Sequence, residues 1–334
     1  MVCRSGRHIV TLLVVWALIS PLDVFGATPF YSKNLSPFAL IYGLPANLNG
    51  NVVEEGRTEV RLHAEAANNF VVRQTGDTLV VFDGETYRTA AVFSYGLKDR
   101  LEIGMELPYI THAEGVLDYF IADWHEFFRL PKVGRDKRPN AVLEYRYVQD
   151  GKLQYLVDTP SSGMGDLVLF AGYRLYRDRG PDYRATALRA SLKLPTGSAT
   201  DLHGSGGWDV SLALAGTDNK TFFPWNLSVY GALGLMLTGS SEVLNDIRQD
   251  LVGFGSLGLG WQGWSRLELK LQIDTHTPLY DSSFDELGSI AAQLNIGGTV
   301  SFSDETLLDI NVTEDIIVDS MPDVSFQLSL RQIF

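Results

Sequence analysis

Apolar and polar residues alternate one by one over long stretches of this chain. The stretch that begins at Thr58 places Val60, Leu62, Ala64 and Ala66 on one side, and Glu59, Arg61, His63 and Glu65 on the other. The same pattern recurs at 101–107 and 267–274, and in weaker form at 188–194 and 289–300. Because successive side chains of a β-strand point to opposite faces, this alternation predicts strands with one apolar and one polar face.

Alternation alone also fits a soluble β-sandwich, in which the apolar faces pack together and the charged faces meet water. A membrane barrel is favoured because the polar side of these segments is rich in small residues, as a crowded lumen requires. The segments are also about 10 to 14 residues long, the length with which a tilted strand crosses a membrane. Aromatic residues near the strand ends suit interfacial girdles: Tyr109, Tyr173, Trp261, Trp264 and Tyr280.

The last residues carry a further signal. Phe326, Leu328, Leu330 and the terminal Phe334 share one parity, and Ser325, Gln327, Ser329 and Arg331 share the other. This pattern is similar to the closing-strand signal that the bacterial barrel-assembly machinery reads. We therefore expect Phe334 to contact that machinery.

Together these patterns predict an all-β protein, a transmembrane antiparallel up-and-down β-barrel of about twelve strands. The expected strands are 58–72, 78–96, 98–109, 165–177, 183–195, 208–216, 225–238, 250–262, 264–276, 288–302, 305–315 and 323–334. Two further segments, 141–149 and 152–158, flank Asp150-Gly151, a hairpin signal. They could form an extracellular extension or two more barrel strands, which would raise the number to fourteen.

The connections alternate between short and long. With a periplasmic N-terminus, the short ones become periplasmic turns and the longer ones extracellular loops, as outer-membrane barrels require. The longest excursion, 110–164, contains Leu117, Phe120, Ile121, Trp124 and Phe128 at helical spacing. We expect a short amphipathic helix there, which either folds into the mouth as a constriction or packs on the barrel rim or lipopolysaccharide.

The chain begins with a pattern typical of a secretory signal peptide, here residues 1–26. Arg4 and Arg7 precede an apolar run from Ile9 to Ile19 that is too short to span a membrane as a helix, and Gly26-Ala27 suit cleavage. Removing this leader changes 27 basic and 40 acidic residues to 25 and 39, so the net charge moves from −13 to −14. It also removes Cys3, the one cysteine, and the acidic remainder argues against nucleic acid as a partner.

Residues 27–56 lack any regular alternation and contain Pro29, Pro37 and Pro45. Such a segment could be a periplasmic arm or a plug inside the lumen. The barrel itself is expected to occupy residues 57–334.

Several short motifs along the chain together carry a family resemblance. They are Tyr42-Gly43-Leu44-Pro45 with Pro37, Gly84-Glu85-Thr86-Tyr87, Leu117–Ile121 with Trp124-His125, Leu130-Pro131 with Gly134-Arg135-Asp136, Gly165-Asp166, Leu194-Pro195-Thr196-Gly197, Asp274 with Thr277-Pro278, and Glu314-Asp315 before Pro322-Asp323. Together they resemble a domain-of-unknown-function family (number 3187) of proteobacterial outer-membrane β-barrel proteins. The resemblance spans nearly the whole mature chain and implies a barrel but no particular activity. Arg129 stands where glycine is expected, and Leu194–Gly197 also looks like strand ends of barrels linked to uptake of hydrophobic or aromatic compounds.

The candidate functional residues are those expected to line the lumen or its constriction. They are Asp118, Trp124, His125, Arg135 and Asp136 in the long loop, and Glu59, Arg61, His63, Arg88, Glu102, Arg189, Lys193, Glu268, Lys270 and Asp274 on the strands. Glu106, Arg174 and Asp309 should face the lumen as well. Since both signs of charge are present, these groups either select a solute or form internal salt bridges.

Three functions compete. The polar lumen favours a narrow channel or passive uptake route for small molecules, among which hydrophobic ones are candidates. A blocked barrel with a structural or surface-binding role is the alternative. A lipid hydrolase using Ser205 and His203 is a third interpretation, because residues two apart on a strand face the same way. We expect no enzyme activity, no cofactor and no metal site, and the expected partners are outer-membrane lipid, lipopolysaccharide and an unidentified solute.

Overall fold

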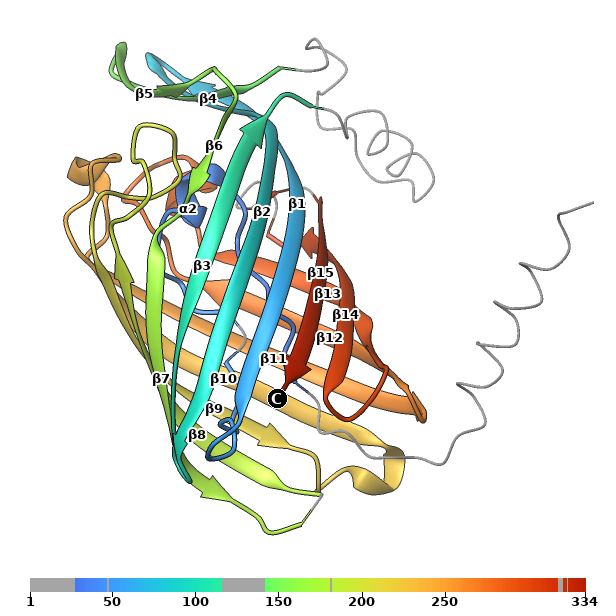
Figure 1. Cartoon of the computed structure of the whole chain (residues 1–334). Coiled ribbons are helices and arrows are strands. Elements are labelled where there is room, and N and C mark those ends of the chain that lie inside the picture. Colours follow the sequence, from blue (N-terminus) through green and yellow to red (C-terminus); the bar gives the residue numbers. More distant parts are fainter. Residues whose placement is uncertain (1–27, 47, 116–141, 181, 318–320, 323) are drawn as a thin grey trace, which may run out of the picture.

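A computed structural model describes residues 28–46, 48–115, 142–180, 182–317, 321–322 and 324–334. Fifteen strands join in one antiparallel sheet, and twelve of them close into a barrel. Figure 1 shows the barrel from the side. The twelve are β1 (Thr58–Thr75), β2 (Thr78–Lys98), β3 (Leu101–Ala113), β7 (Leu167–Arg177), β8 (Arg184–Leu194), β9 (Asp209–Asp218), β10 (Leu227–Thr238), β11 (Leu251–Trp264), β12 (Leu267–His276), β13 (Ala291–Ser301), β14 (Thr306–Asp315) and β15 (Val324–Ile333).

The barrel closes where the first strand meets the last. β1 pairs with β15 from Glu59↔Ile333 to Asn68↔Val324, and every other strand pairs with its neighbours along the chain. This confirms the predicted up-and-down barrel of twelve strands. Closure leaves no unpaired edge at membrane depth, which a β-protein in lipid requires.

The outer surface of the barrel is apolar and its interior is polar. Leu233 is 75% exposed and Leu62 53% exposed on the outside, whereas Glu59 and Arg61 of the same strand as Leu62 are buried. A soluble sandwich would bury the leucines instead. The periodic apolar side chains therefore face lipid, and the charged ones face the lumen.

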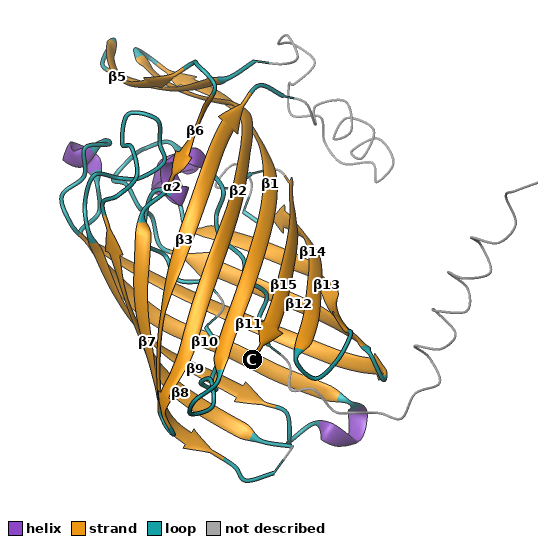
Figure 2. Cartoon of the chain, viewed as in Figure 1, coloured by secondary structure: helices purple, strands orange, loops and turns teal. Residues whose placement is uncertain are grey.

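The two ends of the barrel differ in their connections. We call the end with the short connections 99–100, 178–183, 219–226, 265–266 and 302–305 the turn end. The other end, with the connections 76–77, 114–166, 195–208, 239–250, 277–290 and 316–323, is the loop end. Figure 2 shows the loops gathered at one end of the sheet.

The predicted hairpin around Asp150-Gly151 exists and lies outside the closed barrel. β4 (Glu144–Gln149) and β5 (Lys152–Val157) flank two residues with positive φ, 50° and 73°, as this turn type requires. β4 pairs with Leu79–Asp83, the part of β2 that projects together with β1 beyond β3 and β15, and β6 (Ser161–Met164) pairs with the corresponding end of β3. The hairpin is thus an extension of the loop end.

The helices are short: α2 (Pro37–Leu40), η2 (Phe223–Trp225), η3 (Asn245–Ile247) and α4 (Asp285–Gly288). None of the helices in the described residues is long and apolar enough to cross a membrane. The helix expected at 117–128 lies outside the described residues.

Aromatic side chains lie on the outside of the barrel near its ends, with one exception to the prediction. Tyr109, Tyr173 and Trp261 are exposed, and Trp225 and Phe222 stack at the turn end with ring centroids 6.2 Å apart. Tyr280 is buried instead, because its loop folds inward and its hydroxyl donates to the Phe38 carbonyl (2.9 Å). It belongs to the interior of the loop end and not to a girdle.

Candidate functional site

The interior of the barrel contains the segment before β1, residues 28–56, which we call the N-terminal arm. Thr28 lies beside Lys270, in the turn half of β12, and the chain then runs toward the loop end, where α2 sits. From there it returns to the turn end, where Glu55 bridges to Gly96 of β2. Figure 1 shows α2, in blue, among the connections of the loop end. The arm is therefore a hairpin-shaped insert with its tip at the loop end.

The rising limb of the arm is bound by polar groups of β12. Lys270 donates from Nζ to the Thr28 carbonyl (2.9 Å), and the Phe30 amide donates to Gln272 Oε1 (2.8 Å). Lys270 also lies 4.0 Å from the centroid of the Phe30 ring. Charge-assisted bonds to backbone carbonyls hold this limb without any pairing between strands.

The returning limb is bound by the opposite wall. Arg189 of β8 donates to the carbonyls of Asn49 (3.0 Å) and Asn51, and the Val53 amide donates to Glu102 Oε2 (2.6 Å). Arg189 also forms an ion pair with Glu102. Glu102 lies on β3 and Arg189 on β8, and these strands are not neighbours. β7 lies between them, and its Gly172 is in register with both Glu102 and Arg189. A Cβ at Gly172 would lie 2.7 Å from Arg189 Nη1, so the glycine leaves the space in which the pair forms.

A buried charge cluster joins the arm to β1, β2 and β3. Arg88, 1% exposed, forms ion pairs with Glu65 and Glu106 and donates to the Tyr31 hydroxyl at 2.7 Å. Lys33 of the arm adds a second cation, 3.3 Å from Glu106. Two cations thus face two carboxylates, and the cluster is neutral as a whole.

The tip of the arm is held by apolar contacts. Phe38, Ile41 and Tyr42 belong to a buried hydrophobic cluster that includes residues of β2, the β4–β5 hairpin and the loops 195–208, 239–250 and 277–290. Burial of each such side chain contributes roughly 1.5–3 kcal/mol. The loop end is consequently closed by a core like that of a globular protein.

Lys193 marks the boundary between this core and the polar lumen. Its Nζ lies 2.7 Å from Asp166, 3.2 Å from Asp209 and 2.8 Å from the Ile41 carbonyl. The Gly43 amide donates to Asp209 at 2.7 Å, so the arm takes part in the same network.

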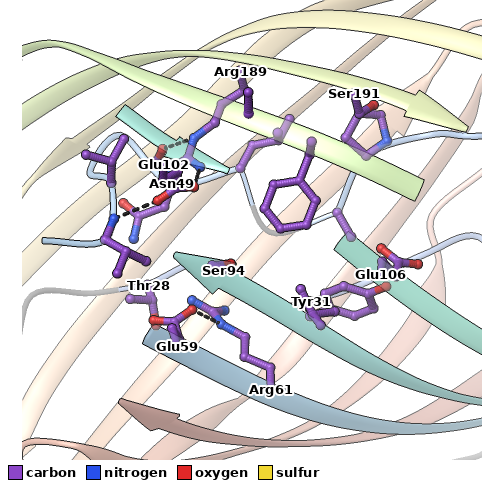
Figure 3. A pocket seen from close by; sticks show the side chains of 18 of the residues that line it. Thr28, Tyr31, Asn49, Glu59, Arg61, Ser94, Glu102, Glu106, Arg189 and Ser191 are labelled. Atoms are coloured by element: carbon purple, nitrogen blue, oxygen red, sulfur yellow. Dashed lines mark hydrogen bonds and ion pairs between the residues drawn. The ribbon is translucent and has the colours of Figure 1, made fainter. Parts of the chain in front are cut away.

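The turn half of the interior encloses a cavity of about 310 Å³ between the arm and the wall. Figure 3 shows the Arg61–Glu59 pair and the Arg189–Glu102 pair on opposite sides of it. The side of the cavity formed by the arm contains Leu44, Pro45, Leu48 and Val52, and the wall adds Val92 and Phe170. The cavity combines charged and apolar surface, and its volume is at the lower limit for small-molecule sites, about 300–1,000 Å³.

Most of the sequence-predicted strand residues lie inside the barrel. Beyond the contacts above, Lys270 pairs with Asp309 (2.8 Å), Glu268 accepts a hydrogen bond from Ser228 (3.3 Å), and His63 stacks on Tyr31 with ring centroids 3.6 Å apart. Asp274 accepts hydrogen bonds from Gln272 (2.9 Å) and Asn295 (2.8 Å) and borders a second, smaller cavity of about 50 Å³. Five predicted constriction residues, Asp118, Trp124, His125, Arg135 and Asp136, lie outside the described residues.

Arg174 differs from the expectation that it faces the lumen. It lies near the turn end of β7, where the register shifts between Arg174 and Tyr176, and it donates to the Asp99 carboxylate at 2.8 Å. The local irregularity directs it to the turn between β2 and β3.

Ser205 and His203 do not form a nucleophile and base. Ser205 Oγ contacts Lys193 Nζ at 2.5 Å, whereas His203 Nε2 lies 3.1 Å from Ser161 Oγ. Both are buried, because the loop 195–208 folds inward and Asp166 accepts bonds from its backbone amides at Gly197 (2.8 Å) and Ser205 (3.2 Å). The loop is thus packed inside the barrel, and desolvation lowers the pKa of His203.

Several residues that shape the interior were not predicted from the sequence. No sequence pattern marked the arm residues Tyr31, Lys33 and Phe38, because a segment without periodicity does not show which face of a residue is buried or what it contacts. Arg331 did carry one, because it shares the lumen-facing parity of Gln327 and Ser329.

The barrel shares its fold with a solved structure. An outer-membrane channel from Pseudomonas putida F1 superposes with a TM-score of 0.55 at 14% identity, over 88% of this chain and 100% of that one. The NanC porin gives a TM-score of 0.46 at 8% identity, over 82% of this chain and 98% of that one. The Pseudomonas putida toluene transporter TodX gives 0.38 at 11% identity, over 93% and 95%. Because these identities are so low, the first likeness shows a shared fold and no more.

At the level of sequence, the chain matches no curated protein. The profile of a family described as "Protein of unknown function (DUF3187)" matches residues 7–334. The family resemblance predicted from the motifs is thereby confirmed.

Proposed function

The chain belongs to this DUF3187 family of outer-membrane β-barrel proteins, and we propose that it is a passive channel for small molecules whose lumen is closed by the N-terminal arm. The loop end then faces the cell exterior, and the turn end with Phe334 faces the periplasm. The leader 1–26 is removed, and Phe334 is read by the barrel-assembly machinery.

The observation that carries this proposal is that the ion pairs of the wall do not depend on the arm. Arg88 pairs with Glu65, Arg189 with Glu102, and Lys193 with Asp166, all within or beside the strands. Lys270 likewise pairs with Asp309. A lumen without the arm would keep these pairs and could fill with water, which is what a pore needs.

The arm is also separable from the sheet. Apart from the bridge Glu55↔Gly96, its contacts with the wall are side-chain bonds and apolar packing, while the twelve strands pair only with one another and with the loop-end extension. Withdrawing the arm would therefore open the interior without breaking the barrel.

Single-channel recording in planar bilayers tests the proposal. We expect few openings of the full chain and steady conductance when residues 28–52 are deleted. A matched control is a Ser32→Cys, Gln293→Cys variant, because the native side chains hydrogen-bond at 2.6 Å. The oxidised form should stay closed and the reduced form should behave like the parent chain.

The second candidate, a non-conducting structural barrel, is favoured by the apolar cluster at the loop end, to which loops and strands together contribute more residues than the arm. If the loops close the barrel by themselves, the variant that lacks residues 28–52 will fold but show no conductance in the bilayer. That result would overturn the channel and support the structural role.

A further inference from the structure

The cavity in the turn half has an unusual pair of cations on its wall. Arg61 of β1 and Arg331 of β15 are register partners across the seam of the barrel, and both line the cavity. Like charges directly opposite on neighbouring strands destabilise a sheet. Glu59 lies between them, 2.5 Å from Arg61 and 3.9 Å from Arg331, and is the carboxylate they share.

The other charges of the cavity are balanced. Arg189 pairs with Glu102, Lys33 belongs to the neutral cluster of Arg88, Arg57 pairs with Glu305 (2.6 Å), and Glu54 pairs with Arg177 (3.8 Å). Arg61, Arg331 and Glu59 together leave one positive charge. Among the described residues that line the cavity, this is the one positive charge without a partner on the lining; Glu268 and Asp309, which interact electrostatically with Arg331, do not line it.

The two arginines also have unused hydrogen-bond donors. Arg61 donates only its Nε–H, to Glu59, within the described part of the chain. The Arg331 guanidinium makes no hydrogen bond to any described residue, since 3.9 Å to Glu59 is too long for one. A guanidinium carries five N–H donors in a planar fork that suits a carboxylate. Their side chains are only 7% and 12% exposed, and both residues line the cavity.

The rest of the cavity surface is largely apolar. Val52, Leu44 and Leu48 come from the arm, and Val92, Val168 and Phe170 come from the wall. The exposed Glu54 and the partly exposed Arg57 stand at its rim, so the cavity reaches the turn end. A molecule that entered there would find Arg61 and Arg331 on one side, and apolar side chains beside the Arg189–Glu102 pair on the other.

From this arrangement we infer that the cavity binds a small organic monoanion, a carboxylate held by Arg61 and Arg331 with an apolar body against Val52 and Phe170. The unused donors of two guanidinium groups suit one carboxylate, and about 310 Å³ admits only a small molecule. That this anion is the cargo of the channel rests on the proposed function. That the cavity binds the anion is independent of it.

Calorimetric titration of the full-length protein in detergent with benzoate tests it, with benzamide as the neutral analogue of the same shape and inorganic phosphate as an anion without an apolar body. We expect benzoate to bind at least about tenfold more tightly than benzamide, because charged hydrogen bonds contribute roughly 1.5–3 kcal/mol. Phosphate should bind more weakly than benzoate.

Arg331→Gln and Arg61→Gln should each weaken benzoate binding by about tenfold or more. Arg184→Gln is the matched control, because Arg184 pairs with Asp178 (2.9 Å) at the turn end away from the cavity, and it should leave the affinity unchanged. Glu59→Gln should instead strengthen benzoate binding and improve phosphate binding. This gain cannot come from misfolding, and heat-modifiable migration in gels verifies the folded state of each variant.

Equal binding of benzoate and benzamide, no binding of benzoate, or unchanged affinity in Arg331→Gln would overturn the inference. Phosphate binding as tight as benzoate binding would overturn the apolar part of it. The binding measurement requires no transport, whereas bilayer conductance requires no ligand. A failure of the site and a failure of the channel are therefore distinguishable.

Discussion

The loop end and the turn end of the barrel interior hold the same arm in different ways. At the loop end, α2 packs into an apolar cluster built from loops and strand ends. At the turn end, the limbs of the arm are bound through backbone groups by charged side chains such as Lys270 and Arg189, and a cavity of about 310 Å³ remains between them.

This difference separates two physical tasks. Apolar contacts exclude water, and removing one side chain weakens the packing of its neighbours as well. The tip is therefore the part of the arm that closes the barrel. Hydrogen bonds to backbone groups contribute only about 0.5–3 kcal/mol each and can be exchanged for water. The limbs can therefore loosen around a ligand while the tip stays in place.

The largest effect is expected at the tip. Phe38→Ala removes a side chain that is 1% exposed and should weaken the seating of the arm by about 3–5 kcal/mol, the usual cost of Phe→Ala in a core. Limited proteolysis of the arm, with the barrel protected by detergent, should become much faster. Phe223→Ala, at an exposed turn-end position, is the control. Equal proteolysis of the two variants would show that the apolar cluster does not hold the arm.

A smaller effect is expected at the turn end. Gly172→Val places side-chain atoms between Arg189 and Glu102 and should release residues 49–53, at a cost of about 1–3 kcal/mol. Hydrogen exchange of the Val53 amide should accelerate, as it should in Arg189→Gln, while exchange at α2 should not change. If exchange at α2 accelerated equally, the two ends of the arm would be one cooperative unit and the comparison would fail.

The smallest effect is a pH dependence confined to the loop end. Burial lowers the pKa of His203, which stacks on His112 (5.7 Å) and faces Asp201. A displaced loop would regain the ordinary pKa near 6.5 and bind more protons, so the stability of the loop 195–208 is full above that value and falls as the pH drops below it. Hydrogen exchange between pH 7.5 and 5 should show this in the parent chain and less of it in His203→Gln. An identical pH response in both would assign the effect to other groups.

The strands and their faces were predictable because alternation is local. Even the Glu65–Arg88 pair could have been derived, since the two-residue turn after Thr75 fixes Glu65 opposite Arg88. The Arg189–Glu102 pair could not, because it forms across an intervening strand and depends on the gap at Gly172. Barrel-wide geometry of this kind is absent from any local pattern.

The arm and the inward loops were not predictable for a related reason. Phe38 and Tyr280 are aromatic residues in irregular segments, and whether they meet lipid or each other depends on which way the segments turn. Arg331 shows the opposite case: its parity placed it in the lumen, but its value as a site follows only from the register with Arg61.

The hairpin shape of the arm determines the direction in which it can be withdrawn from the barrel. Both of its limbs pass through the turn half, and the second limb continues directly into β1, so its tip can retreat only toward the turn end. A force or binding partner that unseats it must act from that side of the membrane, whereas a molecule arriving at the loops meets only the closed face. If the barrel is the channel proposed above, the event that opens it would have to occur at the turn end, opposite to the end at which an external solute arrives.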